Sequence, residues 1–521
     1  MSTVSKTSQE IIRLSGHEIV GLLRTGQFSA REVVEASIER IEEVNPKLNA
    51  LVVPLFEQAR REAAKLDAGF GRSEQPGPLH GVPFTVKESV EVAGTPSTLG
   101  LTERVTHRAT SDAVQVTRLK QAGAVLLGKT NVSLLLRAYE TDNPVYGRTN
   151  NPWSVDRAPG GSSGGEASII AAGGSVLGLG SDFGGSIRLP AHACGIHGLR
   201  PTSGRLTMLG HARIQSSGLG GIASQPGPIA RSVADLSTAM QVLAAPGQEI
   251  LDPAVPPVAL SDRADISKLR VAFYTDNGII SPAPALRRAV HEAAAALEAY
   301  GAEVEEWQPP DLFEAWEIQL RLTCADGLAS YRRALRRSKG TKVRLAAMPG
   351  VVRSAMALAA EMVGQRRLAA SMRQKRQVSI EELAELLGRK RRYAVAFLEA
   401  MNARRIDTII CPPDTLPALR HGSSFYVSGL SISYPGLYSM LGMPTGVVAA
   451  TRVRPNEESD RPKSRDLIER AAHHVEKGSA GLPVGVQVVA RHWREDVVLK
   501  VMAAIEEHFR QKSDYPAWPS I

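Results

Sequence analysis

Apolar positions recur at helical spacing near the start of the chain. Ser29 and Glu32 have the spacing of a capping box, and an apolar stripe from Val33 to Val44 follows them. We therefore expect an amphipathic helix that begins after Ser29 and stops at Pro46. A second helix is expected over residues 54–68, followed by a glycine- and proline-rich loop over residues 71–78.

An alternating pattern of apolar and polar residues follows that loop. Val82, Phe84 and Val86 alternate with Pro83, Thr85 and Lys87, which is the period-two pattern of a β-strand. Lys87 is then the last residue of the strand, on the same face as Thr85 and opposite the valines. A helical pattern from about residue 111 leads into a short apolar run, residues 124–127, which predicts a buried parallel strand.

Glycine dominates the next part of the chain. Residues 159–204 contain 13 glycines among 46 residues, yet they also hold core-type side chains such as Ile169, Leu177 and Ile187. Each glycine loses more backbone entropy on folding than other residues, so this density needs a reason. Glycines mixed with core residues indicate tight turns and close approach of the backbone to a ligand.

Strand and helix patterns alternate through the remaining chain. Strands are expected at residues 269–273, 408–411, 445–449 and 484–489, and a helix at residues 283–300. Alternation of this kind favours the α/β class with a large mixed β-sheet flanked by helices. At 521 residues the chain could hold two or three domains or one large domain.

Composition narrows the class of protein. Hydrophobic residues make up 43% of the chain and charged residues 22%, which is typical of a globular protein. Three scattered cysteines, Cys194, Cys324 and Cys411, do not make a disulfide framework or a metal motif. With no export signal and no run of 18 apolar residues, we expect a cytoplasmic protein.

Two sequence motifs point to nucleotide binding and are judged to be chance matches. Residues 123–130 satisfy the P-loop pattern, but the residues inside the match read as a strand, whose amides are used in a sheet. Residues 178–184 resemble a dinucleotide fingerprint with one residue too many before the last glycine.

Two further patterns concern nucleophiles and metals. Ser162 and Ser163 each fit a G-x-S-x-G nucleophile elbow, and the downstream histidines His421, His473, His474 and His492 keep that option open. His192, Cys194 and His197 lie close together in sequence, but without another clustered ligand they do not make a convincing metal site.

One combination of motifs resembles a known family. Pro83-x-x-Val-Lys87-Glu88, the GGSSGGE run at 160–166, GSDFGGSIRLPA at 180–191, GIHGLRPT at 195–202 and GLPVGVQVVA at 481–490 together resemble the amidase signature family. The similarity extends from about residue 28 to 508 and is greatest to the fatty acid amide hydrolase branch. It implies the amidase signature fold as a single large domain over residues 28–510, with residues 1–27 as an N-terminal extension.

The resemblance also implies a set of site residues and no cofactor or metal. Ser186 would be the nucleophile, Ser162 the bridging serine after a cis peptide bond, and Lys87 the general base. The backbone amides of Phe183, Gly184, Gly185 and Ser186 would form an oxyanion hole. Ser163, Asp182 and Arg188 would support these groups, the last two as an ion pair.

Lysine can act as a base only when its amine is neutral. Its pKa must fall well below the ordinary value near 10.4, and burial lowers it by penalising the charged form. Val82, Phe84 and Val86 around Lys87 make such burial plausible. The serine between base and nucleophile would then pass the proton along.

The net charge of +9 is unevenly distributed. Residues 331–376 contain 13 Lys and Arg and one acid, Glu361, so the rest of the chain is mildly acidic. Apolar residues from Met348 to Val363 recur near helical spacing in this segment, and Arg353, Arg366 and Arg367 can lie off that stripe. We expect either a cap-like helical segment in peripheral contact with a membrane or an ordinary helix with a solvated basic face. With Tyr331 as its single aromatic residue, nucleic acid is not an expected partner.

Three functions are compatible with the sequence. The first is hydrolysis of a small-molecule amide, including fatty acid or other apolar amides, through an acyl-enzyme. The second is a glutaminase-type subunit of a tRNA-dependent transamidation complex, and the third is a non-catalytic basic binding protein of the same fold. Acyl length, preference for amides over esters, and a homodimer as the assembly are left open.

Overall fold

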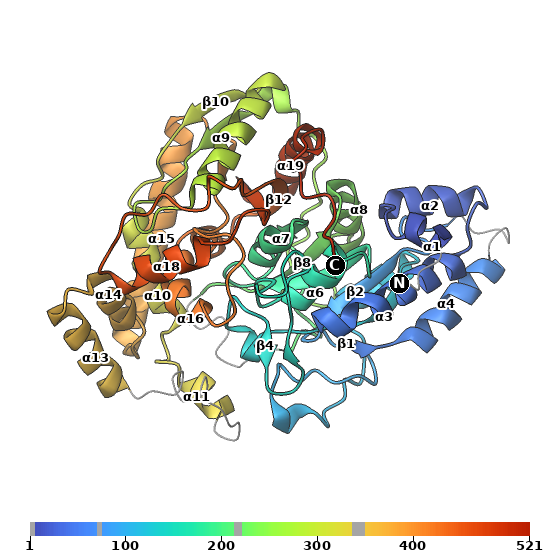
Figure 1. Ribbon diagram of the computed structural model, residues 1–521, viewed down its shortest axis with the longest axis horizontal. Helices are drawn as coiled ribbons and strands as arrows, with labels where there is room; N and C mark the ends of the chain where they lie inside the picture. The colour runs from blue at the N-terminus through green and yellow to red at the C-terminus, as the bar shows by residue number, and fades with distance from the viewer. Residues whose placement is uncertain (1–5, 70–75, 213–220, 336–349) are drawn as a thin grey trace.

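A mixed β-sheet forms the centre of the molecule (Figure 1). The computed structural model describes residues 6–69, 76–212, 221–335 and 350–521. Within those residues the large sheet has eleven strands in the order β1-β3-β2-β6-β8-β7-β12-β13-β11-β9-β10. In chain order their bounds are β1 Leu51–Pro54, β2 Pro83–Lys87, β3 Val125–Thr130, β6 Leu177–Asp182, β7 His197–Arg200, β8 Gln225–Ala230, β9 Arg270–Phe273, β10 Glu303–Glu306, β11 Thr408–Cys411, β12 Thr445–Arg452 and β13 Pro483–Ala490. A separate short ribbon pairs β4 Asp142–Asn143 with β5 Gly147–Arg148.

Helices cover both faces of this sheet, so the chain forms one α/β domain, as expected. On one face pack α2 Gly16–Arg24, α5 Val114–Gln121, α8 Val233–Leu243, α9 Pro284–Ala299 and α19 Glu495–Arg510. On the other face, α3 Ala30–Leu48, α4 Phe56–Gly69, α6 Gly164–Ala171 and α7 Arg188–Cys194 cover the N-terminal half. The C-terminal half of that face is covered by α10 Leu312–Thr323, α15 Ile380–Ala403 and α17 Pro435–Leu441. The remaining helices are α1 Lys6–Ile11, α11 Ala329–Leu335, α13 Gly350–Met362, α14 Arg366–Gln374, α16 Ser424–Ser431 and α18 Leu467–Glu476.

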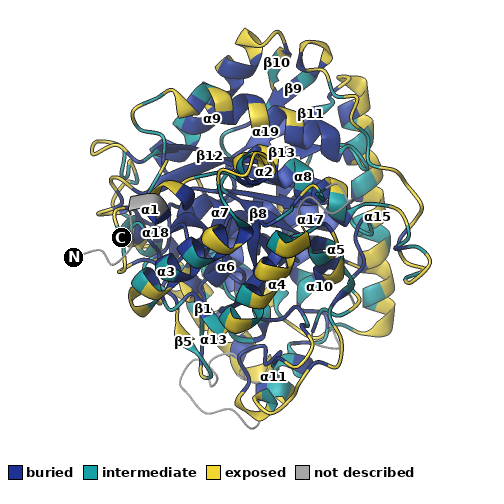
Figure 2. Cartoon of the chain, turned by 90° about the vertical axis from the view of Figure 1, so that its right-hand side faces the viewer, coloured by how far each residue is buried: buried dark blue, intermediate teal, exposed yellow. Residues whose placement is uncertain are grey.

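The centre of the sheet is the most deeply buried part of the molecule. Every residue of β2, β6, α6 and α7 is buried, and the area around α6 and α7 is dark blue in Figure 2. β2 and β6 are parallel neighbours, with Thr85 opposite Gly178. Their carboxyl ends, Lys87 and Asp182, therefore lie at the same edge of the sheet.

The helix predicted after Ser29 is α3, which begins where expected but ends later than expected. The hydroxyl of Ser29 accepts the amide of Glu32, and the Glu32 carboxylate accepts the Ser29 amide, which completes the capping box. Pro46, however, lies inside α3, which continues to Leu48 and ends where Asn49 takes a left-handed conformation. A proline in the last turn removes only one hydrogen bond, so it does not stop the helix.

The six predicted strands all occur in the structure, whereas β1, β6, β7, β8 and β10 of the large sheet were not predicted. Phe84 and Val86 pack in the core on one face, so Lys87 and Thr85 point to the opposite face, toward α6. β1 lies just before the second helix, where the sequence analysis expected that helix to begin. The first 27 residues, expected as an extension, include α1 and α2, whose Ile11, Ile19 and Leu23 belong to the main core.

The basic segment is described only in part. Residues 336–349 lie outside the described residues, so the stripe that was expected to begin at Met348 is described only from α13 onward. On α13 the apolar side chains face outward, with Val351 84% and Met362 79% exposed, while Arg353 is buried. Of the helices in the described part of the chain, none is long and apolar enough to span a membrane.

Candidate active site

Lys87 lies at the end of β2 with its side chain fully buried. Its Nζ is 2.7 Å from Ser162 Oγ and 3.1 Å from both the carbonyl oxygen and the hydroxyl of Ser181. The sheet thus brings Lys87 together with Ser162, although 75 residues separate them in the chain.

Burial changes the acid–base behaviour of this lysine. Loss of hydration lowers the pKa of Lys87 to about 7, although the carboxylates of Asp182 and Glu166 act in the opposite direction. The amine is therefore substantially neutral near physiological pH. Burial also raises the pKa of Glu166 to about 8, against hydrogen bonds from the hydroxyls of Thr130 and Thr85.

The glycine- and serine-rich run places Ser162 beside Lys87. The Gly161–Ser162 peptide bond is cis, as the resemblance implied. α6 begins at Gly164, directly after the two serines, and Ser163 donates its amide to the carbonyl of Ser186 at 3.2 Å. This hydrogen bond joins the loop that carries Ser162 to the loop that carries Ser186.

Close packing of α6 on β6 explains two of the glycines. A Cβ atom on Gly178 would lie 2.0 Å from Glu166 Oε1, and one on Gly180 would lie 3.1 Å from Ser163 Oγ. Side chains at these two positions would push α6 away from the sheet and move both serines away from Lys87.

Ser186 lies between the end of β6 and the start of α7. It is 8% exposed, compared with 1% for Ser162 and zero for Lys87. Exposure therefore increases along the series from lysine to Ser186, and Ser186 is the member that a substrate can reach first.

Asp182 organises the loop around Ser186. Its carboxylate accepts the amide of Gly185 at 2.7 Å and the amide of Ile187 at 3.1 Å. It also forms the expected ion pair with Arg188, at 3.0 Å and fully buried. Although burial opposes ionisation, Arg188 and these hydrogen bonds hold the pKa of Asp182 well below its usual range.

Arg188 links this loop to the C-terminal half of the chain. Its guanidinium donates to the Pro435 carbonyl at 2.8 Å, to the Gln487 side chain at 2.8 Å and to the Ser439 hydroxyl at 2.7 Å. Elements far apart in sequence therefore fix the position of the loop.

One of the four amides expected in the oxyanion hole is already used. Gly185 donates its N–H to Asp182, so this amide does not point toward a substrate oxygen. The amides of Phe183, Gly184 and Ser186 remain as the expected donors. The side chain of Phe183 is partly buried and packs against the core cluster of α10, α15 and α17.

Two residues at the site were missed by the sequence analysis. Ser181 provides two of the three contacts of Lys87, and the Tyr139 hydroxyl donates to the carbonyl of Gly184 at 2.8 Å. Ser181 sits in the glycine-rich motif, so its place in β6 could have drawn attention to it. Tyr139 reaches the site from a distant loop, which no local pattern reveals.

The competing motifs occupy other environments. Gly128, Lys129 and Thr130 lie within β3, and the Lys129 ammonium contacts Thr95 and Ser97 rather than a phosphate-binding loop. Ser162, a candidate for the nucleophile elbow, has a lysine rather than a histidine as its partner.

The histidines and cysteine near Ser186 are engaged in structural contacts. His192 contacts the Leu416 carbonyl at 3.0 Å and accepts the Gly485 amide, and His197 lies 3.2 Å from Glu506. Cys194 is fully buried.

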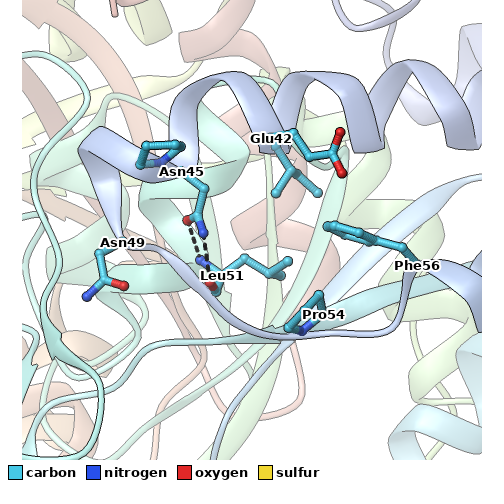
Figure 3. A pocket seen from close by; sticks show the side chains of 8 residues that line it. Glu42, Asn45, Asn49, Leu51, Pro54 and Phe56 are labelled. Atoms are coloured by element: carbon cyan, nitrogen blue, oxygen red, sulfur yellow. Dashed lines mark hydrogen bonds between the residues drawn. The ribbon is translucent and has the colours of Figure 1, made fainter.

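A surface hollow of about 480 Å³ lies away from this site (Figure 3). It is formed by the end of α3, β1 and the start of α4, and Asn45 there binds both the amide and the carbonyl of Leu51. None of the candidate site residues lines this hollow.

Comparison with known proteins gives a consistent result. A family model described as Amidase matches residues 32–499. Fatty-acid amide hydrolase 1 of Sus scrofa is 33% identical over 517 residues, which cover 96% of this chain and 86% of the relative. A solved fatty acid amide hydrolase superposes with a TM-score of 0.84 at 25% identity, covering 96% of this chain and 86% of its own. A glutamyl-tRNA(Gln) amidotransferase subunit from Carboxydothermus hydrogenoformans is 37% identical over 306 residues, 58% of this chain and 62% of the relative.

Proposed function

This chain belongs to the amidase signature family and is a hydrolase of amide C–N bonds, and from that premise we propose that Ser186, Ser162 and Lys87 carry out the reaction. Ser186 is the nucleophile, Ser162 relays the proton and Lys87 is the general base. The observation that carries this proposal is the fully buried contact of 2.7 Å between the Lys87 amine and the Ser162 hydroxyl.

The three contacts of Lys87 accommodate a neutral amine as well as an ammonium. A neutral amine has two N–H donors and one lone pair. Ser181 offers a carbonyl oxygen and a hydroxyl oxygen as acceptors, so the lone pair is left for the proton of Ser162. Ser162 can then accept the proton of Ser186 while it gives its own to Lys87.

The reaction then proceeds in two stages. Ser186 Oγ bonds to the amide carbon, and its proton passes through Ser162 to Lys87. Lys87 returns that proton to the departing nitrogen, the C–N bond breaks and an acyl ester remains on Ser186. Water, deprotonated by the same route, attacks the ester and releases the carboxylic acid.

Backbone amides stabilise the charge that develops on the carbonyl oxygen. The amides of Phe183, Gly184 and Ser186 are the proposed donors, held in place by Asp182 and Tyr139. Loss of one such donor typically costs about 2.7–4 kcal/mol in activation free energy. Positioning of this loop is therefore a major contribution of the fold to catalysis.

A fluorophosphonate probe tests the nucleophile directly. We expect the wild-type protein to be labelled at Ser186 when its peptides are read by mass spectrometry, and Ser186→Ala to remain unlabelled. Ser163→Ala is the matched control, because Ser163 is buried beside Ser162 but is assigned a structural role. Labelling at any serine other than Ser186 would disprove the assignment.

We further propose apolar amides, including fatty acid amides, as substrates. Support comes from the names of the relatives and from Ile432, whose side chain lies 3.5 Å from the Cβ position of Gly184 in the oxyanion loop. Turnover of amides with increasing acyl length tests this. Equal kcat/KM for short and long acyl chains would contradict the proposed specificity for fatty acid amides.

A role in transamidation is less well supported. The amidotransferase relative matches 58% of this chain, whereas the fatty-acid amide hydrolase matches 96%. The non-catalytic alternative is set aside, because the family places this chain among amide hydrolases.

We also propose that the basic segment, residues 331–376, makes peripheral contact with a membrane. The support is the outward apolar surface of α13 and the residue after it, where Val351, Met362 and Val363 are 84%, 79% and 72% exposed. Apolar side chains beside basic residues suit the boundary between lipid head groups and acyl chains.

A further inference from the structure

A group of cations converges on the end of α10 with little opposing charge. Arg137 donates from its Nη2 to the carbonyl of Thr323 at 3.0 Å, next to the buried Cys324. The segment that follows Lys375 pairs with the same region, because the Val378 amide donates to the Ala325 carbonyl at 3.0 Å. Arg137 and Lys375 therefore approach Cys324 from two distant parts of the chain.

Arg353 adds a third cation from α13. It is 8% exposed although it belongs to a helix whose other side faces solvent. Arg353 and Arg137 both lie close enough to Lys375 for their charges to lower the pKa of its ammonium, after loss of hydration as the main cause. The neighbours that influence Lys375 and Arg353 are other cations and the Cys324 thiol, with no carboxylate among them in the described part of the chain.

Asp326 lies near Arg137, and both oxygens of its carboxylate already accept hydrogen bonds. Although burial opposes ionisation of Asp326, hydrogen bonds and the charge of Arg137 lower the pKa of its carboxyl. Each of its oxygens accepts a backbone amide, from Leu328 and Ser330, at 2.9 Å. The C-terminus of α10 also attracts cations, because its free carbonyl groups carry partial negative charge. Lys375 and Arg353 give up hydration with no carboxylate among the described groups that act on them. Arg137, by contrast, lies near the Asp326 carboxylate and 5.9 Å from the centre of the Tyr331 ring.

Two connections along the chain lead from this cluster toward the candidate active site. Arg137 precedes Tyr139 by two residues, and the Tyr139 hydroxyl holds the carbonyl of Gly184. On the other side, the Lys375 ammonium lies 3.4 Å from the Cβ position of Gly429 in α16, three residues before Ile432. Three residues of helix rise by about 4.5 Å, and the Ile432 side chain lies 3.5 Å from the Cβ position of Gly184, so the route through α16 is short.

We propose that Arg137, Arg353 and Lys375 form a binding site for an anionic group, a carboxylate or phosphate, on the substrate whose amide Ser186 cleaves. The ammonium of Lys375 and the two guanidinium groups supply charge-assisted hydrogen bonds to its oxygens. This site deepens the proposed function and rests on it. It narrows the substrates to amides with an apolar chain near the scissile bond and a negative charge at one end.

Matched pairs of amides test the proposal. One pair compares an acyl p-nitroanilide ending in a carboxylate with one ending in a methyl group, and the other compares an N-acyl amino acid with the N-acyl amino alcohol of equal length. Each pair is made with several chain lengths. We expect the wild-type protein to prefer the anionic member of at least one pair in kcat/KM.

Lys375→Met should reduce that preference by about tenfold or more, since a hydrogen bond to a charged group is lost. Turnover of the neutral member should stay within a factor of two or three. Arg373→Met is the matched control, because Arg373 is exposed, lies two residues away and already pairs with Glu361. It should keep the preference, and Arg137→Met provides a second test if Lys375→Met unfolds at a lower temperature.

The outcomes separate this proposal from the proposed function. Equal turnover of both members of every pair by the wild-type protein overturns the anion site and leaves the amidase function intact. Inhibition by inorganic phosphate that depends on Lys375, without any preference for the anionic amide, would assign the site to a free anion and overturn the substrate proposal. Absence of turnover for every amide, together with absence of fluorophosphonate labelling, would instead disprove the triad.

Discussion

In the proposed mechanism, the burial of Lys87 sets the conditions for catalysis. Burial lowers its pKa to about 7, so the amine changes from charged to neutral within the physiological range. A charged lysine cannot accept the proton relayed from Ser186. The environment of Lys87 should therefore determine the pH below which activity decreases.

We predict that kcat/KM rises with pH through about 7 and levels off above it. Below the pKa of Lys87 the neutral fraction falls about tenfold for each pH unit, and activity should follow. Initial rates with a neutral amide at constant ionic strength give the profile. A rate that stays constant from well below to well above pH 7 would contradict the assignment of Lys87 as the base.

Lys87→Met provides the control for that profile. Methionine fills a similar volume without an amine, so the fold should be retained while kcat/KM falls by about 10²–10⁴. The remaining activity should no longer increase with pH through about 7.

Asp182 has a different task, which is to hold the loop of Ser186 together. We predict that Asp182→Asn lowers the free energy of unfolding by about 3–5 kcal/mol, because Arg188 would remain buried without its partner. Denaturant unfolding at neutral pH measures the change. Asp514→Asn is the control, since its pair with the partly exposed Arg454 should contribute less than about 1 kcal/mol.

At the scale of elements, local patterns predicted the outer part of the architecture but not the central strands β6, β7 and β8 or most of the shorter helices. The strand at Lys87 and the helix capped by Ser29 follow directly from periodicity and capping chemistry. Pro46 was misjudged because its effect depends on position within the helix. The exposure of the apolar side chains on α13 could not be predicted either, because periodicity identifies an apolar stripe but not the elements that pack against it.

The contact between α6 and β6 leads to a prediction about one glycine. Gly178→Ala would place a methyl group 2.0 Å from Glu166 Oε1, so α6 must shift. We expect a loss of about 1–3 kcal/mol in unfolding free energy and a decrease in kcat, because Ser162 moves with α6. Differential scanning calorimetry and kinetics measure the two effects.

Gly21→Ala in α2 is the matched control. Nothing lies within 4 Å of the Cβ position of Gly21, so alanine should fit there. Because alanine favours helices over glycine, this variant should gain roughly 0.5–1 kcal/mol of stability. Equal destabilisation by both substitutions would show that packing against Glu166 is not the cause.

At the scale of the whole molecule, the sheet assembles a site that the sequence shows only in fragments. Lys87 comes from β2 and Ser186 from the loop after β6, and the two parallel neighbouring strands end at the same edge of the sheet. The family motifs were enough to name these residues. Tyr139 and the partners of Arg188 in the C-terminal half could not be found in this way, because only the folded chain brings them to the loop.

The distribution of charge over the whole chain leads to a last prediction. Residues 331–376 carry a net charge of +12 and the rest of the chain carries −3, so attraction to an anionic surface should be confined to one side. We expect sedimentation with vesicles that contain phosphatidylserine and weaker sedimentation with neutral vesicles. Added salt should reduce the binding, since the Debye length falls from about 10 Å at 0.1 M to about 3 Å at 1 M.

Salt should leave hydrolysis of a small neutral amide unchanged, because the site of Lys87 is buried and distinct from that surface. Met362→Glu should weaken vesicle binding by removing an apolar contact and adding a repulsive charge. Ile380→Glu is the matched control, because Ile380 is 84% exposed but lies at the start of α15, beyond the basic segment. If both variants lose binding equally, or if neither does, α13 is not the element that contacts the membrane, and the excess charge serves another anionic partner.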